Sequence, residues 1–224
     1  MNDLIGRVFD FEKRVFPSND LYAKLAVDGQ SPKALIISCA DSRVVPELIM
    51  QAEPGDLFVC RNAGNIVPPF ATQNGGVSST VEYAVLALGV RDIIVCGHSD
   101  CGAMKALLNP ASLNDMPQVK SWLRHGKEAR QALDKAKINR PSLNSLVELT
   151  KLNVRLQLDR LSVHPKVQAQ LRAGALELHG WYYRIDTGEV QAWEAAEDRW
   201  VAVQESRHGL SILRSRAIQA VGHA

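Results

Sequence analysis

Two side chains that can bind a metal stand three residues apart in the middle of the sequence. His98 offers an imidazole and Cys101 a thiol, and the pair is flanked by Gly97 and Gly102. An imidazole and a thiolate at this spacing can close on one metal ion, and zinc favours such nitrogen and sulfur ligands in a tetrahedron. On its own, the pair is more often a turn histidine beside a small buried cysteine, so a third ligand has to decide between the two interpretations.

A second group of reactive side chains occurs much earlier in the chain. Cys39, Asp41 and Arg43 directly follow an apolar run at 34–38. Cys39 would complete a Cys₂His set, and three protein ligands leave the fourth position of a zinc site open for water. Asp41 could itself be the fourth ligand, or Arg43 could hold it off the metal in a charge-assisted pair, where it could orient an attacking hydroxide. A turn with a weak surface ion pair is the simpler explanation of the same tripeptide.

The chain has two further cysteines, Cys60 and Cys96. Cys96 lies two residues before His98 on the same face of the expected strand, which makes it a rival ligand. Its apolar neighbours Ile94 and Val95 indicate instead that it is buried in the sheet, and we interpret Cys60 in the same way. In a cytoplasmic chain of this size, cysteines are expected to be thiols or metal ligands rather than disulfides.

The elements that must position these residues are short apolar strands that alternate with helices. Runs that are apolar at almost every position are typical of parallel strands covered on both faces. The alternating order favours parallel crossover units, in which ligands bind beyond the carboxyl ends of the strands. Cys39, His98 and Cys101 can therefore meet at one edge of the sheet. We expect strands at 34–38, 57–60 and 93–96, and helices at 46–50, 77–88 and 103–108.

The remaining segments complete the predicted architecture. Residues 1–29 have helical spacing and apolar residues on more than one side, so they could pack on a partner chain or on their own core. We expect a long helix from Pro141 through Leu161, another from His164 to Gly174, and a β-hairpin around Asp186-Thr-Gly188. The prediction is an α/β fold in one domain over residues 1–224: a central, mostly parallel β-sheet flanked by helices, with an N-terminal helical arm and a C-terminal β-hairpin.

Composition excludes several classes of function. The 224 residues are 46% apolar and carry 26 basic and 24 acidic side chains, for a formal net charge of +2. No stretch concentrates the basic residues, so we expect neither a nucleic-acid nor a membrane partner. The first residues lack the apolar segment of a signal peptide, and no segment is apolar enough to span a bilayer. We therefore expect a cytoplasmic protein.

Together, the motifs resemble those of the β-class carbonic anhydrases, in the bacterial and plant-like branch of the family. The resemblance implies one zinc ion per chain on Cys39, His98 and Cys101, with Asp41 and Arg43 as the catalytic dyad. It implies the reversible hydration of carbon dioxide to bicarbonate and a proton. The match covers roughly residues 20 to 185; its motifs are Cys39-x-Asp-Ser-Arg43, His98-x-x-Cys101, Gly55-Asp-Leu-Phe-Val59, Arg61-Asn-Ala-Gly-Asn65, Glu82-Tyr-Ala-Val85 and His179-Gly-Trp181.

The same resemblance implies a substrate site and an assembly. Gln30 would hydrogen-bond the substrate, Phe58, Ala63 and Tyr83 would form a small apolar pocket, and the Gly102 N–H would hold an oxygen of bicarbonate. Without the resemblance, the two aromatic residues would be interpreted as core. The implied assembly is a homodimer built around the N-terminal helices, or a homotetramer. Alternatives are a related zinc hydrolase acting on a substrate such as carbon disulfide, and a non-catalytic protein that binds structural zinc or bicarbonate.

Regulation and proton transfer are less evident from the sequence. Some family members close their site in acid with help from bicarbonate bound to a tryptophan, an arginine and a tyrosine. Those positions are Ile36, Arg61 and Tyr183 here, and isoleucine offers bicarbonate no N–H donor. We therefore expect an open site near neutral pH, with the dyad carboxylate paired to its arginine. No proton shuttle is evident, and Asp100 and His125 are only candidates.

Overall fold

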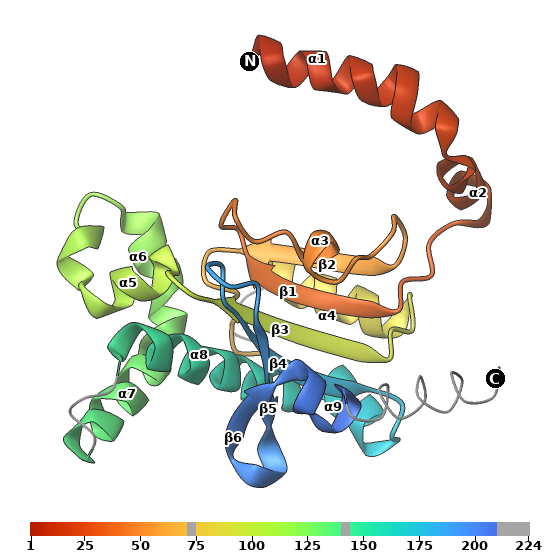
Figure 1. The fold of residues 1–224 in the computed structure, drawn as a ribbon. Helices are drawn as coiled ribbons and strands as arrows, with labels where there is room; N and C mark the ends of the chain where they lie inside the picture. Colours follow the sequence, from red (N-terminus) through yellow and green to blue (C-terminus); the bar gives the residue numbers. More distant parts are fainter. Residues whose placement is uncertain (71–74, 140–143, 210–224) are drawn as a thin grey trace, which may run out of the picture.

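A six-stranded sheet forms the centre of the computed structural model, which describes residues 1–70, 75–139 and 144–209 (Figure 1). The strand order is β2-β1-β3-β4-β5-β6. The first four strands run parallel, whereas β5 and β6 are each antiparallel to the strand before them, which confirms the predicted sheet and hairpin. The strands are β1 (Ala34–Cys39), β2 (Leu57–Asn62), β3 (Asp92–His98), β4 (Glu177–Tyr183), β5 (Val190–Glu194) and β6 (Arg199–Ala202).

The helices begin where the sequence provides suitable first residues. Pro46 and Pro165 occupy the first turns of α3 and α9, where a missing backbone N–H costs nothing. The Asn144 side chain caps α8 by accepting hydrogen bonds from the backbone N–H groups of Leu146 and Val147. The helices are α1 (Asn2–Asp10), α2 (Asp20–Asp28), α3 (Pro46–Ile49), α4 (Gly76–Leu86), α5 (Gly102–Leu108), α6 (Pro117–Leu123), α7 (Lys127–Asn139), α8 (Ser145–Ser162) and α9 (Pro165–Arg172).

The two faces of the sheet are covered unequally. On one face, side chains from α4, α8 and α9 pack against Leu35, Ile37, Ile93 and Val95 in the largest apolar cluster. The opposite face carries a smaller cluster around Ile36 and faces the short helix α3 (Figure 1). β1 and β3 lie inside the sheet under both layers, which explains why their sequences are apolar almost throughout.

The N-terminal helices form an arm that extends away from the sheet (Figure 1). No residue of α1 is buried, although Leu4, Ile5, Val8 and Phe9 are apolar and 45–59% exposed. The rings of Phe11, Phe16 and Tyr22 contact one another where the arm turns from α1 into α2: Phe16 and Tyr22 are stacked, and Phe11 meets Tyr22 edge-on. A contiguous apolar surface of this kind usually marks an interaction site.

Three details differ from the expectation or extend it. β3 continues to His98, so that this residue ends the strand instead of following it. β6 was not predicted; it pairs with β5 through Trp200 opposite Trp193. The expected helix start at Pro141 lies outside the described residues, and α8 begins at Ser145.

Within the described ranges, no helix has both the length and the apolar composition needed to cross a membrane.

Candidate metal centre

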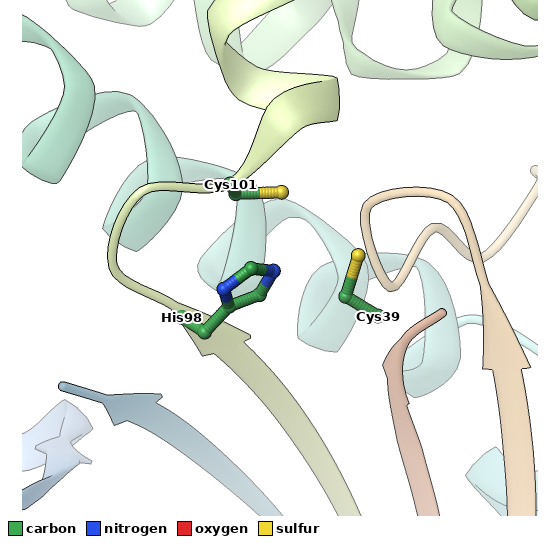
Figure 2. Close-up of side chains that lie close together, drawn as sticks. All are labelled: Cys39, His98 and Cys101. Atoms are coloured by element: carbon green, nitrogen blue, oxygen red, sulfur yellow. The ribbon is translucent and has the colours of Figure 1, made fainter. Parts of the chain in front are cut away.

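Three potential metal ligands meet at the carboxyl end of the parallel strands. Cys39 is the last residue of β1, His98 the last residue of β3, and Cys101 the residue before α5. All three are buried, and one ligand atom from each lies within 4.8 Å of the others. Figure 2 shows both sulfur atoms and one ring nitrogen of His98 directed toward the same space. The predicted convergence of these residues is therefore present.

Two glycines make this close arrangement possible. A Cβ atom at Gly97 would lie 2.8 Å from Val154 Cγ2 and 3.0 Å from Thr150 Cγ2, so any side chain there would push α8 away from the end of β3. Gly64 has φ +81°, and its Cβ would lie 2.9 Å from that of Ala103. A left-handed backbone and a close contact both require glycine at this position. In that conformation the Gly64 N–H donates to Cys39 Sγ at 3.4 Å.

The tautomer of His98 leaves one nitrogen available to a metal. Its Nδ1 lies 2.8 Å from the carbonyl oxygen of Ser99, which can only accept a hydrogen bond, so Nδ1 carries the proton. Nε2 is then the unprotonated nitrogen, and it is buried without a hydrogen-bond partner. Buried polar atoms are rarely left unpaired, and a backbone carbonyl on the far nitrogen is the usual support of a ligating histidine. The site therefore fits a metal ion.

The two thiols share their protons unequally. A hydrogen bond from the Cys101 thiol lowers the pKa of Cys39 to about 4, with further help from His98 and the Gly64 N–H. The same contact and burial raise the pKa of Cys101 above its usual value. Two thiols that share one hydrogen bond, together with an imidazole, are a donor set suited to zinc. Burial alone raises the pKa of Cys96 to about 12, and Cys96 is not among the side chains that converge on this point.

Asp41 and Arg43 form a two-point pair beside the cluster. Arg43 Nε donates to Asp41 Oδ1 at 3.0 Å and Nη2 donates to Oδ2 at 2.8 Å. These bonds hold the pKa of Asp41 well below its usual range. Arg43 also contacts Asp100 at 3.1 Å, and Asp100 is in turn paired with Lys105. The predicted pairing of carboxylate and guanidinium is therefore present, and Asp100 restrains the arginine from its other side.

Polar residues of α8 support the cluster from below, and the sequence interpretation missed them. Asn153 donates to the Gly64 carbonyl at 3.0 Å, and Gln157 donates to Asn153 at 2.8 Å and accepts from the Val67 N–H at 2.9 Å. All three contacts are buried, and they fix the loop that carries the Gly64 N–H. The available signal was two amide side chains four residues apart on a helix face that also carries Leu149, Val154 and Leu161.

The residues expected to contact substrate fall into two groups. Ala63 and Gly102 are adjacent to the cluster, next to Gly64 and Cys101 respectively. Gln30, Phe58 and Tyr83 are not brought to the cluster of their own chain. Phe58 lies opposite Leu35 near the start of β2, whereas Cys39 lies opposite Asn62 at its end, about 13 Å further along at ~3.3 Å per residue.

The other two members of the second group share the location of Phe58. The ring of Tyr83 lies 5.9 Å from the ring of Phe58 and is half exposed. Gln30 is exposed in the loop that precedes β1, at the end opposite Cys39. The parallel register therefore places Gln30, Phe58 and Tyr83 at the other edge of the sheet from Cys39 of the same chain, and their contact with substrate stays a prediction.

The residues expected to bear on regulation and proton transfer have other contacts. Ile36 is buried in the second apolar face, and Tyr183 packs on the same cluster. Arg61 donates to the backbone carbonyls of Cys39 and Asp41, at 3.1 and 2.7 Å, and so braces the segment between the metal ligand and the dyad. His125 packs edge-on against Trp122, whose indole N–H donates to the Ala63 carbonyl.

Comparison with known proteins agrees with this geometry. Residues 34–190 match the family model described as carbonic anhydrase. A carbonic anhydrase of Pseudomonas aeruginosa is 48% identical over 205 residues, which cover 92% of this chain and 93% of the relative. The structure of the β-carbonic anhydrase CcaA superposes with a TM-score of 0.86 at 43% identity, covering 90% of this chain and 98% of that one. One of two tetrameric β-carbonic anhydrases of Sordaria macrospora superposes with a TM-score of 0.70 at 28% identity, covering 85% of this chain and 92% of that one.

Proposed function

The chain belongs to the β-class carbonic anhydrases, and we propose that it hydrates carbon dioxide. The proposed reaction depends on zinc and reversibly gives bicarbonate and a proton. Cys39, His98 and Cys101 would hold one zinc ion per chain. The observation that carries this proposal is the buried, unpartnered Nε2 of His98 facing two thiols. When bound, zinc supplies a Lewis acid that lowers the pKa of water to about 7 and so makes hydroxide available.

The dyad would orient the nucleophile. An ionised carboxylate only accepts hydrogen bonds, so Asp41 can receive the O–H of the attacking group and fix the direction of its lone pair. Arg43 holds both carboxylate oxygens, which opposes the movement of Asp41 toward the cluster. This restraint also speaks against a closed, purely structural zinc site, since Asp41 is the residue that would have to complete four protein ligands.

Substrate would lie against residues from two protomers. Ala63 and the Gly102 N–H are adjacent to the cluster of their own chain, whereas Gln30, Phe58 and Tyr83 are at the other edge of the sheet. If the latter three contact carbon dioxide and bicarbonate, they must do so in the site of a neighbouring copy. The active unit would therefore be at least a homodimer, and a homotetramer is the larger form that we consider.

The N-terminal arm would hold that assembly together. Its apolar side chains are exposed along α1. Among the residues that the structure describes, no other segment of the chain covers them. A second copy offers the matching surface, because each protomer would present the same arm. A reducing compartment suits the thiol ligands, and none of the four cysteines forms a disulfide, so we place the protein in the cytoplasm.

Stopped-flow measurement of carbon dioxide hydration tests the proposal directly. The zinc-loaded protein should accelerate hydration, and Cys101→Ser should lose both zinc and activity because a hydroxyl replaces a thiolate poorly. The matched control is Cys96→Ser, which changes a buried cysteine two residues before His98 and should keep both. One zinc per chain in the first variant and none in the second would overturn the ligand assignment. A zinc-loaded but inactive wild type would instead favour a non-catalytic role.

A further inference from the structure

A second cluster of metal-binding side chains lies at the opposite end of β3 and β4. Glu177 and His179 are two residues apart on β4, so their side chains share one face of the sheet. His208 follows β6 and reaches the same place. One ligand atom from each of these residues lies within 4.8 Å of the others. No part of the reaction proposed above uses these three residues.

His179 is oriented as metal-ligating histidines usually are. Its Nε2 lies 2.7 Å from Asp92 Oδ1, on the neighbouring strand. An ionised carboxylate can only accept, so Nε2 carries the proton, and in the neutral form of the ring Nδ1 has a free lone pair. A carboxylate on the far ring nitrogen fixes the tautomer and raises the basicity of the ligand. Asp92 therefore acts as the positioning residue of this cluster.

A cation already occupies the neighbourhood of these ligands. Arg207 Nη2 lies 3.0 Å from Glu177 Oε2 and 3.2 Å from His208 Nε2, and the same Glu177 oxygen is 3.3 Å from His208 Nε2. The arginine side chain is 73% exposed, so it can move into solvent without disturbing the core. Its contacts mark a position that favours positive charge and that a smaller, more concentrated cation can take over.

We propose that Glu177, His179 and His208 form a second metal site for a first-row transition-metal dication such as Zn²⁺. Two imidazoles and one carboxylate are a donor set that zinc accepts, and they differ from the thiolate set of the first centre. The two sites are separated by the length of β3, about 20 Å at ~3.3 Å per residue. The bound ion joins the segment after β6 to the start of β4, beside a groove of about 770 Å³ lined in part by Trp181 and Trp193.

Calorimetric titration of the zinc-loaded protein with further Zn²⁺ tests this site. Wild type should bind one additional equivalent, and His208→Ala should bind none. The matched control is His125→Ala, which removes a histidine outside the cluster and should retain the additional equivalent. Asp92→Asn should weaken binding about 10- to 100-fold, the usual effect of losing a ligand's supporting carboxylate. Arg207→Gln should tighten it, because the competing guanidinium is gone.

Two further measurements separate this site from the catalytic one. Cys101→Ser should lose the first equivalent and keep the second, and Co²⁺ at the second site should lack a thiolate charge-transfer band. His208→Ala should keep full carbon dioxide hydration, since His208 is not among the residues proposed to hold the catalytic zinc or to contact substrate. Equal stoichiometry in wild type and His208→Ala would overturn the proposal whether or not the protein hydrates carbon dioxide. A thiolate band on the additional equivalent would overturn it as well.

Discussion

Gln157 on α8 links the metal centre to the fold, and replacing it by methionine tests that link. Methionine has a similar length and an unbranched chain, so Gln157→Met leaves little empty space. It does remove the acceptor of the Val67 N–H and the donor to Asn153 Oδ1, at 2.9 and 2.8 Å. Both groups are buried, and Gln157 itself is fully inaccessible to solvent.

The expected cost follows from the two groups left without partners. Each buried donor or acceptor that loses its hydrogen bond costs about 1–3 kcal/mol, so the free energy of unfolding should fall by about 2–6 kcal/mol. For a chain of this size, the melting temperature falls by about 2–4 °C per kcal/mol, which gives a decrease of about 4–24 °C. Release of Asn153 also loosens the Gly64 loop that donates to Cys39, so zinc should dissociate faster.

Thermal unfolding and zinc release to a chelator measure both effects, at one fixed protomer concentration because assembly contributes to stability. Thr150→Val is the matched control on the same helix. Its hydroxyl donates to the Leu146 carbonyl at 2.8 Å, and that carbonyl keeps its helical partner, so the cost should be about 1 kcal/mol or less. Equal melting temperatures for Gln157→Met and wild type would refute the claim that this network supports the centre.

Four other predictions concern the proposed reaction. Arg43→Ala should lower kcat/KM about 10²-fold by misplacing Asp41 while zinc stays bound, and wild-type turnover in stopped flow would remove Arg43 from the mechanism. Tyr83→Ala and Cys101→Ser should each have little hydration activity alone, yet co-expression of the two variants should recover part of it. In a mixed dimer the Cys101→Ser chain supplies the Tyr83 ring and the Tyr83→Ala chain supplies the zinc site. No recovery would place Tyr83 in the site of its own chain. Deletion of residues 1–28 should give monomer or aggregate in sedimentation, and a monomeric full-length protein at micromolar concentration would contradict the role of the arm. Because Arg43 lowers the pKa of Asp41, the carboxylate should stay ionised as the pH falls from 7 through about 3.9, the pKa of an aspartate in the unfolded chain. The pairing should be lost only when the pH approaches the lowered pKa of the folded state. Infrared difference spectra against Asp41→Asn that show titration between pH 7 and 4 would contradict this.

The sequence was most informative where local pattern and topology agree. Apolar runs at 34–38, just before Cys39, and at 93–96, two residues before His98, predicted parallel strands, and parallel strands place their carboxyl ends at one edge. The cluster of Cys39, His98 and Cys101 followed from that rule. The pairing of Asp41 with Arg43 was predictable as well, because two residues in one turn can meet without help from distant elements.

The sequence was least informative where position depends on register or on distant contacts. Phe58 and Tyr83 have residue types suited to an apolar pocket, but only the pairing of Leu35 with Phe58 shows that they lie at the far edge of the sheet. Asn153 and Gln157 partner a loop that lies 89 and 90 residues away in sequence, which no local pattern reveals. β6 escaped notice because its four residues are too short to establish a period.

The exposed arm also creates a timing problem during synthesis. Residues 2–28 emerge from the ribosome before any strand, whereas the four parallel strands are complete only at Tyr183. At roughly 5–20 residues per second, an apolar helix waits about 10–30 s for the sheet of its own chain. Parallel pairing is itself slow, since the contacts are distant in sequence. If the arm pairs with a second copy as proposed above, pairing during translation would cover its apolar side chains before the sheet is complete.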